Sequence, residues 1–311
     1  MIDTFRHEAL FYAGFDDFVA GTSAFVREGF EAGEPVLVVV DAKKIGALRD
    51  AVGNARRGSP VLFADMANVG GNPARIIPAW REFVAEHATD GRRLRGIGEP
   101  IWAARSAAEL AECQRHEALL NLAFADAPAW WLLCPYDVHS LDEPVLEAAR
   151  RTHPFLMEGG ASVASNAFPG TDAWTSTFDA PLAPPPAGTA TLSFGHTPLG
   201  DLRKLVSRLG TAAGLSRSKV EDLVLAVNEL ATNSQRHAGG EGRLRVWEDG
   251  GEVVAEVSDR GHIRDPLVGR HLPPADGEGG RGIWLVNQLC DFVELRSSPA
   301  GTIVRLHMRL A

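Results

Sequence analysis

A proline-rich stretch at residues 181–189 (Pro-Leu-Ala-Pro-Pro-Pro-Ala-Gly-Thr) limits what this chain can fold into more than any other feature. Consecutive prolines favour a stiff extended segment that can join neither a helix nor a central strand. A chain of 311 residues is also long enough to form two hydrophobic cores. We therefore expect two domains, residues 1–158 and 190–311, separated by a tail and linker at residues 159–189.

The overall composition excludes several classes of protein. The formal net charge of −9 argues against a nucleic-acid-binding protein, because contact with phosphates needs a basic face. No apolar run is long enough to span a bilayer, and residues 1–8 lack the basic-then-apolar pattern of a signal peptide. The three cysteines, Cys113, Cys134 and Cys290, are too scattered to indicate a disulfide framework. We expect a reduced, cytoplasmic protein that contacts neither nucleic acid nor membrane directly.

The first half alternates short apolar runs with amphipathic stretches. Continuous runs rich in β-branched residues predict buried strands, and apolar residues at helical spacing predict helices between them. This alternation is typical of an α/β fold with a parallel sheet covered on both faces. The strands are expected at residues 35–40, 61–64, 93–97 and 130–134, and the helices near residues 15–32, 42–52, 73–88 and 106–125.

The second half has a different pattern. Two amphipathic helices come first, then a hairpin around Asp249-Gly250-Gly251, a further helix and two final strands. We expect an α+β domain in which helices pack on one face of a mixed sheet. The helices are expected at residues 199–209, 220–231 and 283–289, and the strands at residues 243–247, 253–258, 292–296 and 302–308.

The second helix of this half carries polar groups suited to a nucleotide and its metal. Glu229 and Asn233 are four residues apart, so they project from one face about 6 Å apart along the axis. Asn233 offers a carbonyl oxygen to a hard cation such as Mg²⁺, and Glu229 can act as a general base. Asp222, Arg236 and His237 fall near the same face, where Arg236 and His237 are candidate nucleotide contacts. The alternative is a solvated polar face.

Two glycine-containing segments downstream complete the pattern. Asp259 ends an expected strand and can accept a hydrogen bond from an adenine amino group, while Gly261 lets the backbone approach the base. Residues 277–282 (Gly-Glu-Gly-Gly-Arg-Gly) precede an expected helix, where backbone N–H groups bind anions and Arg281 adds a cation. Each segment alone is compatible with an ordinary turn or loop. Together with the helix, they predict a nucleotide site.

These residues resemble the motifs of the GHKL ATPase superfamily, which includes histidine kinases, gyrase-type ATPases and anti-sigma-factor serine kinases. The resemblance covers about residues 190–311 and implies an α+β GHKL (Bergerat) ATP-binding sandwich that uses ATP and Mg²⁺. It implies that Glu229 is the base and Asn233 the magnesium ligand. The matching positions are Glu229, Asn233 and His237 in the first motif, Asp259 and Gly261 in the adenine motif, and Gly279, Gly280 and Gly282 in the phosphate loop.

Within that superfamily the chain looks most like the anti-sigma-factor branch. The span from Asp259 to Gly282 is short and has no inserted lid helix. The resemblance to the RsbW type implies two kinds of partner, a sigma factor and a STAS-domain anti-anti-sigma protein that is phosphorylated on serine. It leaves open whether the chain is a homodimer. One departure is Ile263, which stands where the adenine motif usually has a second glycine.

The first half contains no phosphate-cradling Gly-x-x-x-x-Gly-Lys-Ser/Thr motif, so we do not expect a second ATPase there. It resembles the MEDS sensory domain of methanogen and methylotroph regulators, which implies a RecA-like core without the phosphate loop. The first half also resembles the N-terminal part of the RsbA-type anti-sigma regulators of actinobacteria, and the resemblance to these regulators spans the whole chain. The segments that carry it are residues 6–10 (Arg-His-Glu-Ala-Leu), 98–102 (Gly-Glu-Pro-Ile-Trp), 115–121 (Arg-His-Glu-Ala-Leu-Leu-Asn) and 134–137 (Cys-Pro-Tyr-Asp).

Several polar and aromatic residues of this half follow expected strands at their carboxyl ends, where open parallel sheets bind ligands. We hypothesise a pocket for a small molecule or signal, lined by Glu99, Trp102, Cys134, Tyr136 and Asp137, with His7 and His116 nearby. The alternative is that the tryptophan and cysteine belong to the core and the acids cap helices. A metal site formed by Cys113, His116 and Cys134 is a weaker alternative.

The sequence therefore favours an ATP-binding switch protein, in which a sensory domain controls a protein-serine kinase of the anti-sigma type. One alternative is a non-catalytic anti-sigma module whose surface is shaped by ATP. Another is a sensor histidine kinase, because His116-Glu117 is similar to a phosphoacceptor box. A histidine on a helix of an α/β domain, beyond a proline linker, is less suited to that role.

Overall fold

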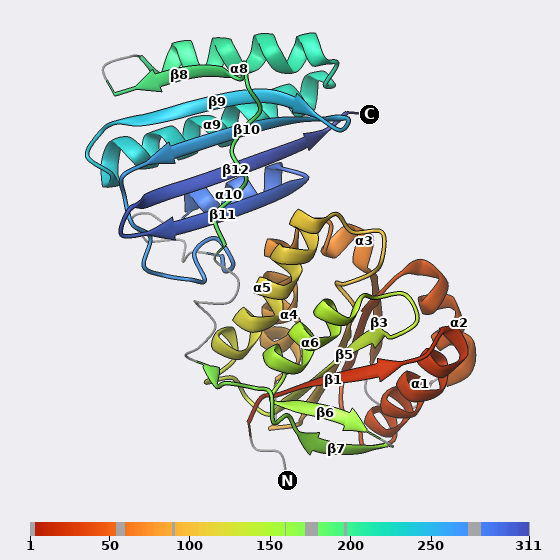
Figure 1. Ribbon diagram of the computed structural model, residues 1–311. Helices are drawn as coiled ribbons and strands as arrows, with labels where there is room; N and C mark the ends of the chain where they lie inside the picture. Colours follow the sequence, from red (N-terminus) through yellow and green to blue (C-terminus); the bar gives the residue numbers. More distant parts are fainter. Residues whose placement is uncertain are drawn as a thin grey trace. The chain divides into compact units, whose positions relative to one another are not determined.

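A computed structural model describes residues 4–53, 60–88, 91–158, 160–171, 180–195, 198–272 and 281–310 of the chain. The chain divides into two compact units, residues 1–178 and 179–311 (Figure 1). Each unit has a sheet and a hydrophobic core of its own. Within the described residues, no helix combines the length and the apolar character needed to cross a bilayer.

The first unit is built on a seven-stranded sheet with the order β3-β2-β4-β5-β1-β6-β7. Neighbouring strands from β3 to β6 run parallel, and β7 is antiparallel to β6. The mostly parallel sheet is as predicted. The strands are β1 (Arg6–Tyr12), β2 (Val36–Val40), β3 (Val61–Asp65), β4 (Leu94–Gly98), β5 (Trp130–Asp137), β6 (Phe155–Glu158) and β7 (Ala161–Ala164).

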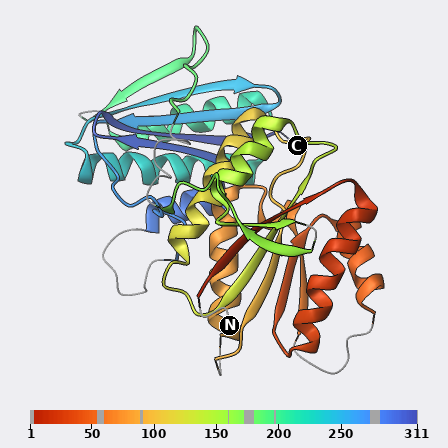
Figure 2. The same cartoon turned by 60° about the horizontal axis from the view of Figure 1, so that its bottom comes forward.

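Helices cover both faces of this sheet, as Figures 1 and 2 show. On one face, α1 (Phe15–Glu31) and α2 (Ala42–Val52) pack their apolar sides against β1, β2, β4 and β5. The opposite face is covered by α4 (Ile76–His87), α5 (Ala107–Ala123) and α6 (Glu143–Thr152). Short segments, α3 (Met66–Val69) and the 3₁₀ helix η1 (Pro73–Arg75), lead into α4. A capping box between Ser106 and Glu109 fixes the start of α5.

The second unit is a five-stranded sheet with the order β11-β12-β10-β9-β8. Each pair of neighbouring strands in the described residues is antiparallel, so the expectation of a mixed sheet is wrong. The reason is that hairpins join β9 to β10 and β11 to β12, and β8 enters as an antiparallel edge strand. The strands are β8 (Ala190–Phe194), β9 (Gly242–Asp249), β10 (Glu252–Asp259), β11 (Phe292–Ser298) and β12 (Gly301–Arg309).

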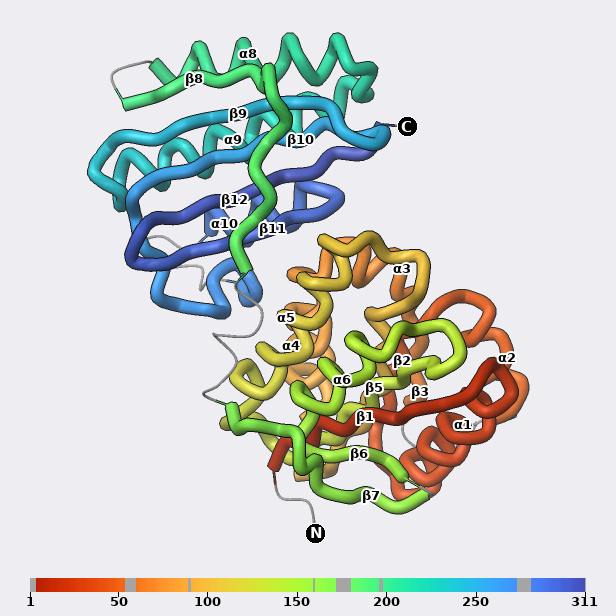
Figure 3. The backbone as a smooth tube through the Cα atoms, in the orientation of Figure 1, coloured from red at the N-terminus to blue at the C-terminus, as the bar shows by residue number. Residues whose placement is uncertain are grey.

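Three helices pack on one face of this sheet: α8 (Leu199–Ala213), α9 (Arg217–His237) and α10 (Arg281–Leu289). The proline-rich segment crosses the other face, where Figure 3 shows it as the green tube in front of the strands. Arg296 donates a hydrogen bond to the carbonyl of Ala180, and Arg305 donates one to the carbonyl of Ala183. The stiff segment is therefore held against the sheet of its own unit.

Candidate functional site

Asp259, the last residue of β10, is held by two hydrogen bonds. Its Oδ1 accepts a hydrogen bond from the backbone N–H of Gly261 at 2.7 Å, and its Oδ2 accepts one from the hydroxyl of Ser234 at 2.5 Å. The hydroxyl of Thr302 on β12 donates to the carbonyl of Gly261. Each carboxylate oxygen can accept more than one hydrogen bond, so Asp259 keeps capacity for a ligand donor.

Gly261 lies where a side chain would not fit. A Cβ there would approach the Cβ of Ala238 to 2.8 Å and Oδ1 of Asp259 to 3.0 Å. The glycine thus lets the strand end close over the last residues of α9. Gly301, with a φ of +141°, comes equally close, because a Cβ there would lie 2.4 Å from the carbonyl oxygen of Asp259. Both glycines keep the Asp259 carboxylate in one orientation.

Helix α9 positions the second group of functional side chains. Its N-cap is Ser216, and its apolar side, which includes Leu223 and Val227, is buried against the sheet. Glu229 and Asn233 lie on a different side and reach the first residues of α10. A Cβ at Gly282 would lie 2.8 Å from Asn233 Nδ2 and 3.4 Å from Glu229 Oε2. The two side chains therefore lie close to Gly282, at the start of α10.

One cavity of about 290 Å³ brings these groups together. It lies between α9, the end of β10, the segment after it and α10. Of the predicted residues, it is lined by Asn233, His237, Asp259, Gly261 and Gly282. Glu229 lies beside Gly282 at its edge.

The other residues predicted for this site are Arg236, Arg281, Gly279 and Gly280. Arg236 and Arg281 are exposed and are not among the residues that line the cavity. Gly279 and Gly280 lie outside the described residues. The departure from the glycine pattern, Ile263, lines the cavity with its side chain while its N–H donates to the Ser297 hydroxyl.

Sequence reasoning missed two hydroxyl residues of the site. Ser234 and Thr302 hold Asp259 and Gly261 in place, and Thr302 lines the cavity. A signal was present for Ser234, since it is the polar residue directly after Asn233 on a helix that faces β10. Thr302 gives no such signal, because it meets Gly261 only through the register of β12 with β10.

The donor set of the cavity suits a purine nucleotide with a hard cation. A fixed carboxylate at one end can accept from an amino group, while Asn233 and Glu229 supply oxygen atoms at the other. The close approach of Gly282 to Asn233 leaves no room for a larger residue between the oxygen ligands and α10. The residues present therefore fit ATP and Mg²⁺.

In the first unit, two of the residues predicted for a sensory pocket, Glu99 and Asp137, lie at the carboxyl ends of strands. Glu99, after β4, accepts hydrogen bonds from Tyr12 Oη at 2.6 Å and from Lys44 Nζ. Burial raises the pKa of Glu99 even though Lys44 opposes it. Burial and Glu99 together raise the pKa of Tyr12. Asp137 instead accepts from backbone N–H groups of its own turn and of Gly14.

Two other predicted residues of that pocket lie elsewhere. The guanidinium of Arg105 stacks 3.8 Å from the ring centre of Trp102, and also donates to the carbonyl of Pro100. His116 is 1% exposed on α5. The Cys113 thiol donates to the carbonyl of Pro100, so this cysteine points away from Cys134 and the suggested trio with His116 does not form.

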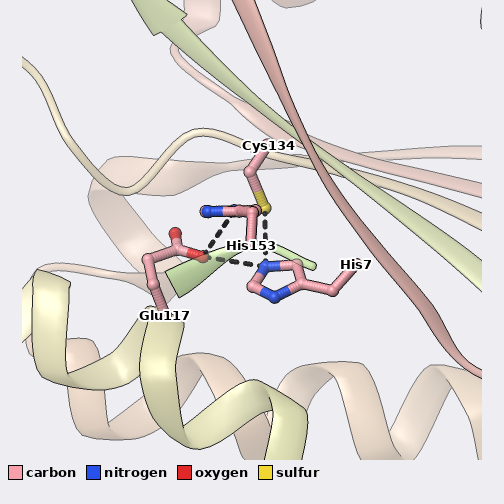
Figure 4. Close-up of side chains that lie close together, drawn as sticks. All are labelled: His7, Glu117, Cys134 and His153. Atoms are coloured by element: carbon pink, nitrogen blue, oxygen red, sulfur yellow. Dashed lines mark hydrogen bonds and ion pairs between the residues drawn. The ribbon is translucent and has the colours of Figure 1, made fainter. Parts of the chain in front are cut away.

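His7 and Cys134 meet in a different, fully buried cluster, together with Glu117 and His153 (Figure 4). Burial, reinforced by His153, lowers the pKa of His7 to about 4. Burial and then Glu117 raise the pKa of the Cys134 thiol. The ring of Tyr136 packs edge-on against His153, with ring centres 5.5 Å apart. Glu117 and His153 were not among the predicted pocket residues.

Comparison with known proteins gives matches for both units. Residues 6–154 match the methanogen/methylotroph, DcmR sensory domain (MEDS), and residues 196–308 match the histidine kinase-like ATPase domain. The serine-protein kinase RsbW of Halalkalibacterium halodurans is 34% identical over 112 residues, a match that covers 32% of this chain and 68% of the relative. The Bacillus subtilis enzyme of the same name is 31% identical over 121 residues. That match covers 34% of this chain and 74% of the relative.

Among solved structures, the RsbU and RsbW domains of a Mycobacterium tuberculosis protein match with 20% sequence identity and a TM-score of 0.31. That match covers 40% of this chain and 33% of the other.

Proposed function

The chain belongs to the RsbW family of serine-protein kinases, and on that premise we propose that it transfers the γ-phosphoryl group of ATP to a serine of a STAS-domain anti-anti-sigma protein. We further propose that the same unit binds a sigma factor and that the MEDS unit regulates the switch.

One observation carries this proposal. A single cavity joins a fixed carboxylate, Asp259, to Asn233 on α9, and Gly282 of α10, which also lines it, lies close to both Asn233 and Glu229. A purine binder without phosphate chemistry has no need of Glu229 and Asn233 beside Gly282. A solvated helix face has no need of a cavity around Asp259.

Each side chain has a definite task in the proposed reaction. Asp259 Oδ1 or Oδ2 accepts the hydrogen bond of the purine amino group, and Ser234 keeps the carboxylate in place. Asn233 would hold Mg²⁺, which when bound neutralises charge on the triphosphate. Glu229 takes the proton of the incoming serine hydroxyl on its carboxylate, because it stands at the phosphate end of the cavity.

The burial of His116 counts against the histidine-kinase alternative. Phosphoryl transfer requires a histidine whose ring nitrogen reaches the γ-phosphate, and this ring is enclosed in the packed α5 of the first unit. A serine on another protein requires no such opening.

The test is transfer of label from γ-labelled ATP to a purified STAS partner. We expect the wild-type chain to label the partner on serine and Glu229→Ala to abolish the label. Glu221→Ala is the matched control, since Glu221 lies two turns earlier on α9 and pairs only with exposed Arg217. Binding of ATP without transfer by the wild type would support a non-catalytic module instead, and acid-labile label on the chain itself would support a histidine kinase.

A further inference from the structure

Four side chains of the first unit bring nitrogen, oxygen and sulfur atoms close together at one buried point (Figure 4). The atoms are an imidazole nitrogen of His7, a carboxylate oxygen of Glu117, the sulfur of Cys134 and an imidazole nitrogen of His153, all within 4.8 Å of one another. Each of the four residues is at most 1% exposed. They come from β1, α5, β5 and the residue after α6, so only the tertiary fold assembles them.

The tautomer of His153 is fixed by its surroundings. Its Nδ1 lies 2.8 Å from the carbonyl oxygen of Ala149. A carbonyl oxygen can only accept, so Nδ1 carries a proton, and in the neutral ring Nε2 presents a lone pair. That Nε2 lies 3.4 Å from Glu117 Oε2, is buried, and has no hydrogen-bond partner among the described residues.

The tautomer of His7 follows from a similar chain of contacts. The amide nitrogen of Asn121 donates to the carbonyl of Thr152 at 2.7 Å, so its Oδ1 is the atom that faces His7. His7 Nδ1 therefore donates to Asn121, at 3.1 Å, and His7 Nε2 also presents a lone pair. That Nε2 lies 3.1 Å from Glu117 Oε2 and 3.4 Å from Cys134 Sγ.

The protons that fix both rings are thus turned away from the cluster. In the neutral rings, the imidazole lone pairs of His7 and His153 face Glu117 Oε2 at 3.1 and 3.4 Å in a buried site. Acceptors at such distances repel one another unless a proton or a metal ion lies among them, because burial removes the screening by solvent. Cys134 is the fourth group around the same point.

We propose that His7, Glu117, Cys134 and His153 bind a transition-metal ion of the Zn²⁺ type in tetrahedral coordination. Ligands at 2.0–2.3 Å from a tetrahedral ion lie roughly 3.3–3.7 Å from one another. The observed separations of 3.1, 3.4 and 3.4 Å are close to that spacing. Nδ1–H groups held by Asn121 and Ala149 are the outer contacts that orient metal-binding imidazoles.

The charges of such a site also balance. The S–H bond of Cys134 breaks, its proton goes to solvent, and a sulfur–metal bond forms, so one proton is released per ion bound. The thiolate and the Glu117 carboxylate then neutralise the two positive charges, and the imidazoles remain neutral. A net charge of zero is what an enclosed site favours. The ion would tie β1 and β5 to α5 and the end of α6.

The test uses the full chain and metal alone. Protein purified without chelator is analysed for bound metal by mass spectrometry, and apo protein is titrated with Co²⁺, which takes the place of Zn²⁺ and reports its geometry by visible absorption. We expect about one ion per chain, intense bands of tetrahedral Co²⁺, and a sulfur-to-cobalt charge-transfer band that Cys134→Ser removes.

Cys113→Ser is the matched control, because Cys113 is equally buried on α5 but bonds to Pro100. It should keep one ion and the charge-transfer band. His153→Ala should lower Co²⁺ affinity at least about tenfold. The wild-type result decides the proposal even if a variant fails to fold: protein that contains no metal as purified and gives no Co²⁺ bands overturns it. A charge-transfer band that persists in folded Cys134→Ser would equally overturn the assignment.

Discussion

At the scale of single residues, the position of Asp259 is the feature on which the nucleotide site depends. Its carboxylate is oriented by one backbone N–H and one hydroxyl, from Gly261 and Ser234. The Ser234 hydroxyl has one proton, and its 2.5 Å contact with Asp259 is shorter than its 3.1 Å contact with the carbonyl of Leu230. In the proposed function, Ser234 would therefore act on the nucleotide through Asp259, as a positioning residue.

We predict that Ser234→Ala weakens ATP binding about fivefold, because one hydrogen bond that orients a carboxylate is worth about 1 kcal/mol. Equilibrium dialysis with labelled ATP measures the change. Thr232→Ala is the matched control: its hydroxyl also bonds a carbonyl four residues back, at Asn228, but does not touch Asp259. Equal weakening by both variants would show that helix α9, and not the carboxylate, had been disturbed.

We also predict that Gly282→Ala lowers the rate of phosphoryl transfer at least about tenfold, because displacing groups around the reacting atoms by an ångström is costly. The new Cβ would lie 2.8 Å from Asn233 Nδ2, so Asn233 must move. Gly200→Ala, in α8, is the control, since its Cβ would meet only the flexible end of Arg203 at 3.7 Å. Initial rates of label transfer at saturating ATP compare the variants. Full activity in Gly282→Ala would contradict the assignment of Asn233.

The grouping of Glu229, Asn233 and Asp259 around one cavity could be predicted from the sequence, because helical spacing brings Glu229 and Asn233 to one face and a strand end exposes Asp259. The buried cluster could not. Its members are separated by 110, 17 and 19 positions, so no local spacing joins them. Cys113 and His116, which do have helical spacing, point elsewhere.

At the scale of elements, the outer face of the second sheet carries a charged network on its central strands. His307 on β12 lies between two carboxylates, with Nδ1 2.6 Å from Glu252 and Nε2 3.1 Å from Glu294. Arg305 bonds to Glu256 on β10 and to the proline-rich segment. Both nitrogens of His307 face acceptors, so the protonated ring satisfies both.

This arrangement predicts that stability depends on pH. Burial acts to lower the pKa of His307, but Glu252 and Glu294 outweigh it and raise the pKa above 6.5. A raised pKa in the folded state means that the stabilisation is complete below about pH 6.5 and is lost as the pH rises through the higher value. Hydrogen exchange of β11 and β12 amides, corrected for intrinsic rates, should show less protection at pH 8.5 than at pH 6.

In His307→Gln this difference should shrink, because glutamine does not titrate. A wild type whose β11 and β12 protection is the same at both pH values, or rises with pH, would contradict the assignment of a protonated His307.

Sequence periodicity predicted the strands with continuous apolar runs but not β1, β6, β7 or β8. Strand β1 lies between β5 and β6 and is buried, yet it contains His7, whose nitrogens face Asn121 and Glu117 far along the chain. A polar residue interrupts the apolar run by which a buried strand is predicted, and its distant partners cannot be found from the local sequence. The mixed sheet was predicted wrongly because apolar alternation does not encode strand direction.

At the scale of the whole molecule, the two hydrophobic cores predict two unfolding transitions that respond separately to a ligand. One core joins α8, α9 and α10 to the second sheet, and another joins α1 and α2 to the first. A ligand that binds one folded unit stabilises it by about 2.7 kcal/mol at a hundredfold excess over its Kd. The response should therefore be confined to the unit that binds.

Differential scanning calorimetry of the full chain should resolve two transitions, and Mg·ATP should raise one of them by roughly 8 °C while the other stays unchanged. The variant Asp259→Asn identifies the transition that belongs to the ATP-binding unit. In this variant, ATP should raise the midpoint of that transition less than it does in the wild type. If ATP moved both transitions equally in the wild type, the two cores would not be independent.

The central claim is that one cavity binds the purine at Asp259 and the metal-bound triphosphate at Asn233. Calorimetric titration of the full chain with ATP, with and without Mg²⁺, tests it most directly. Asp259→Asn should lose about 1.5–3 kcal/mol of binding energy in both conditions, since a charged hydrogen bond is removed. Asn233→Ala should lose only the part that depends on Mg²⁺. A wild type that ignores ATP, or an Asp259→Asn variant that binds it equally well, would contradict the account.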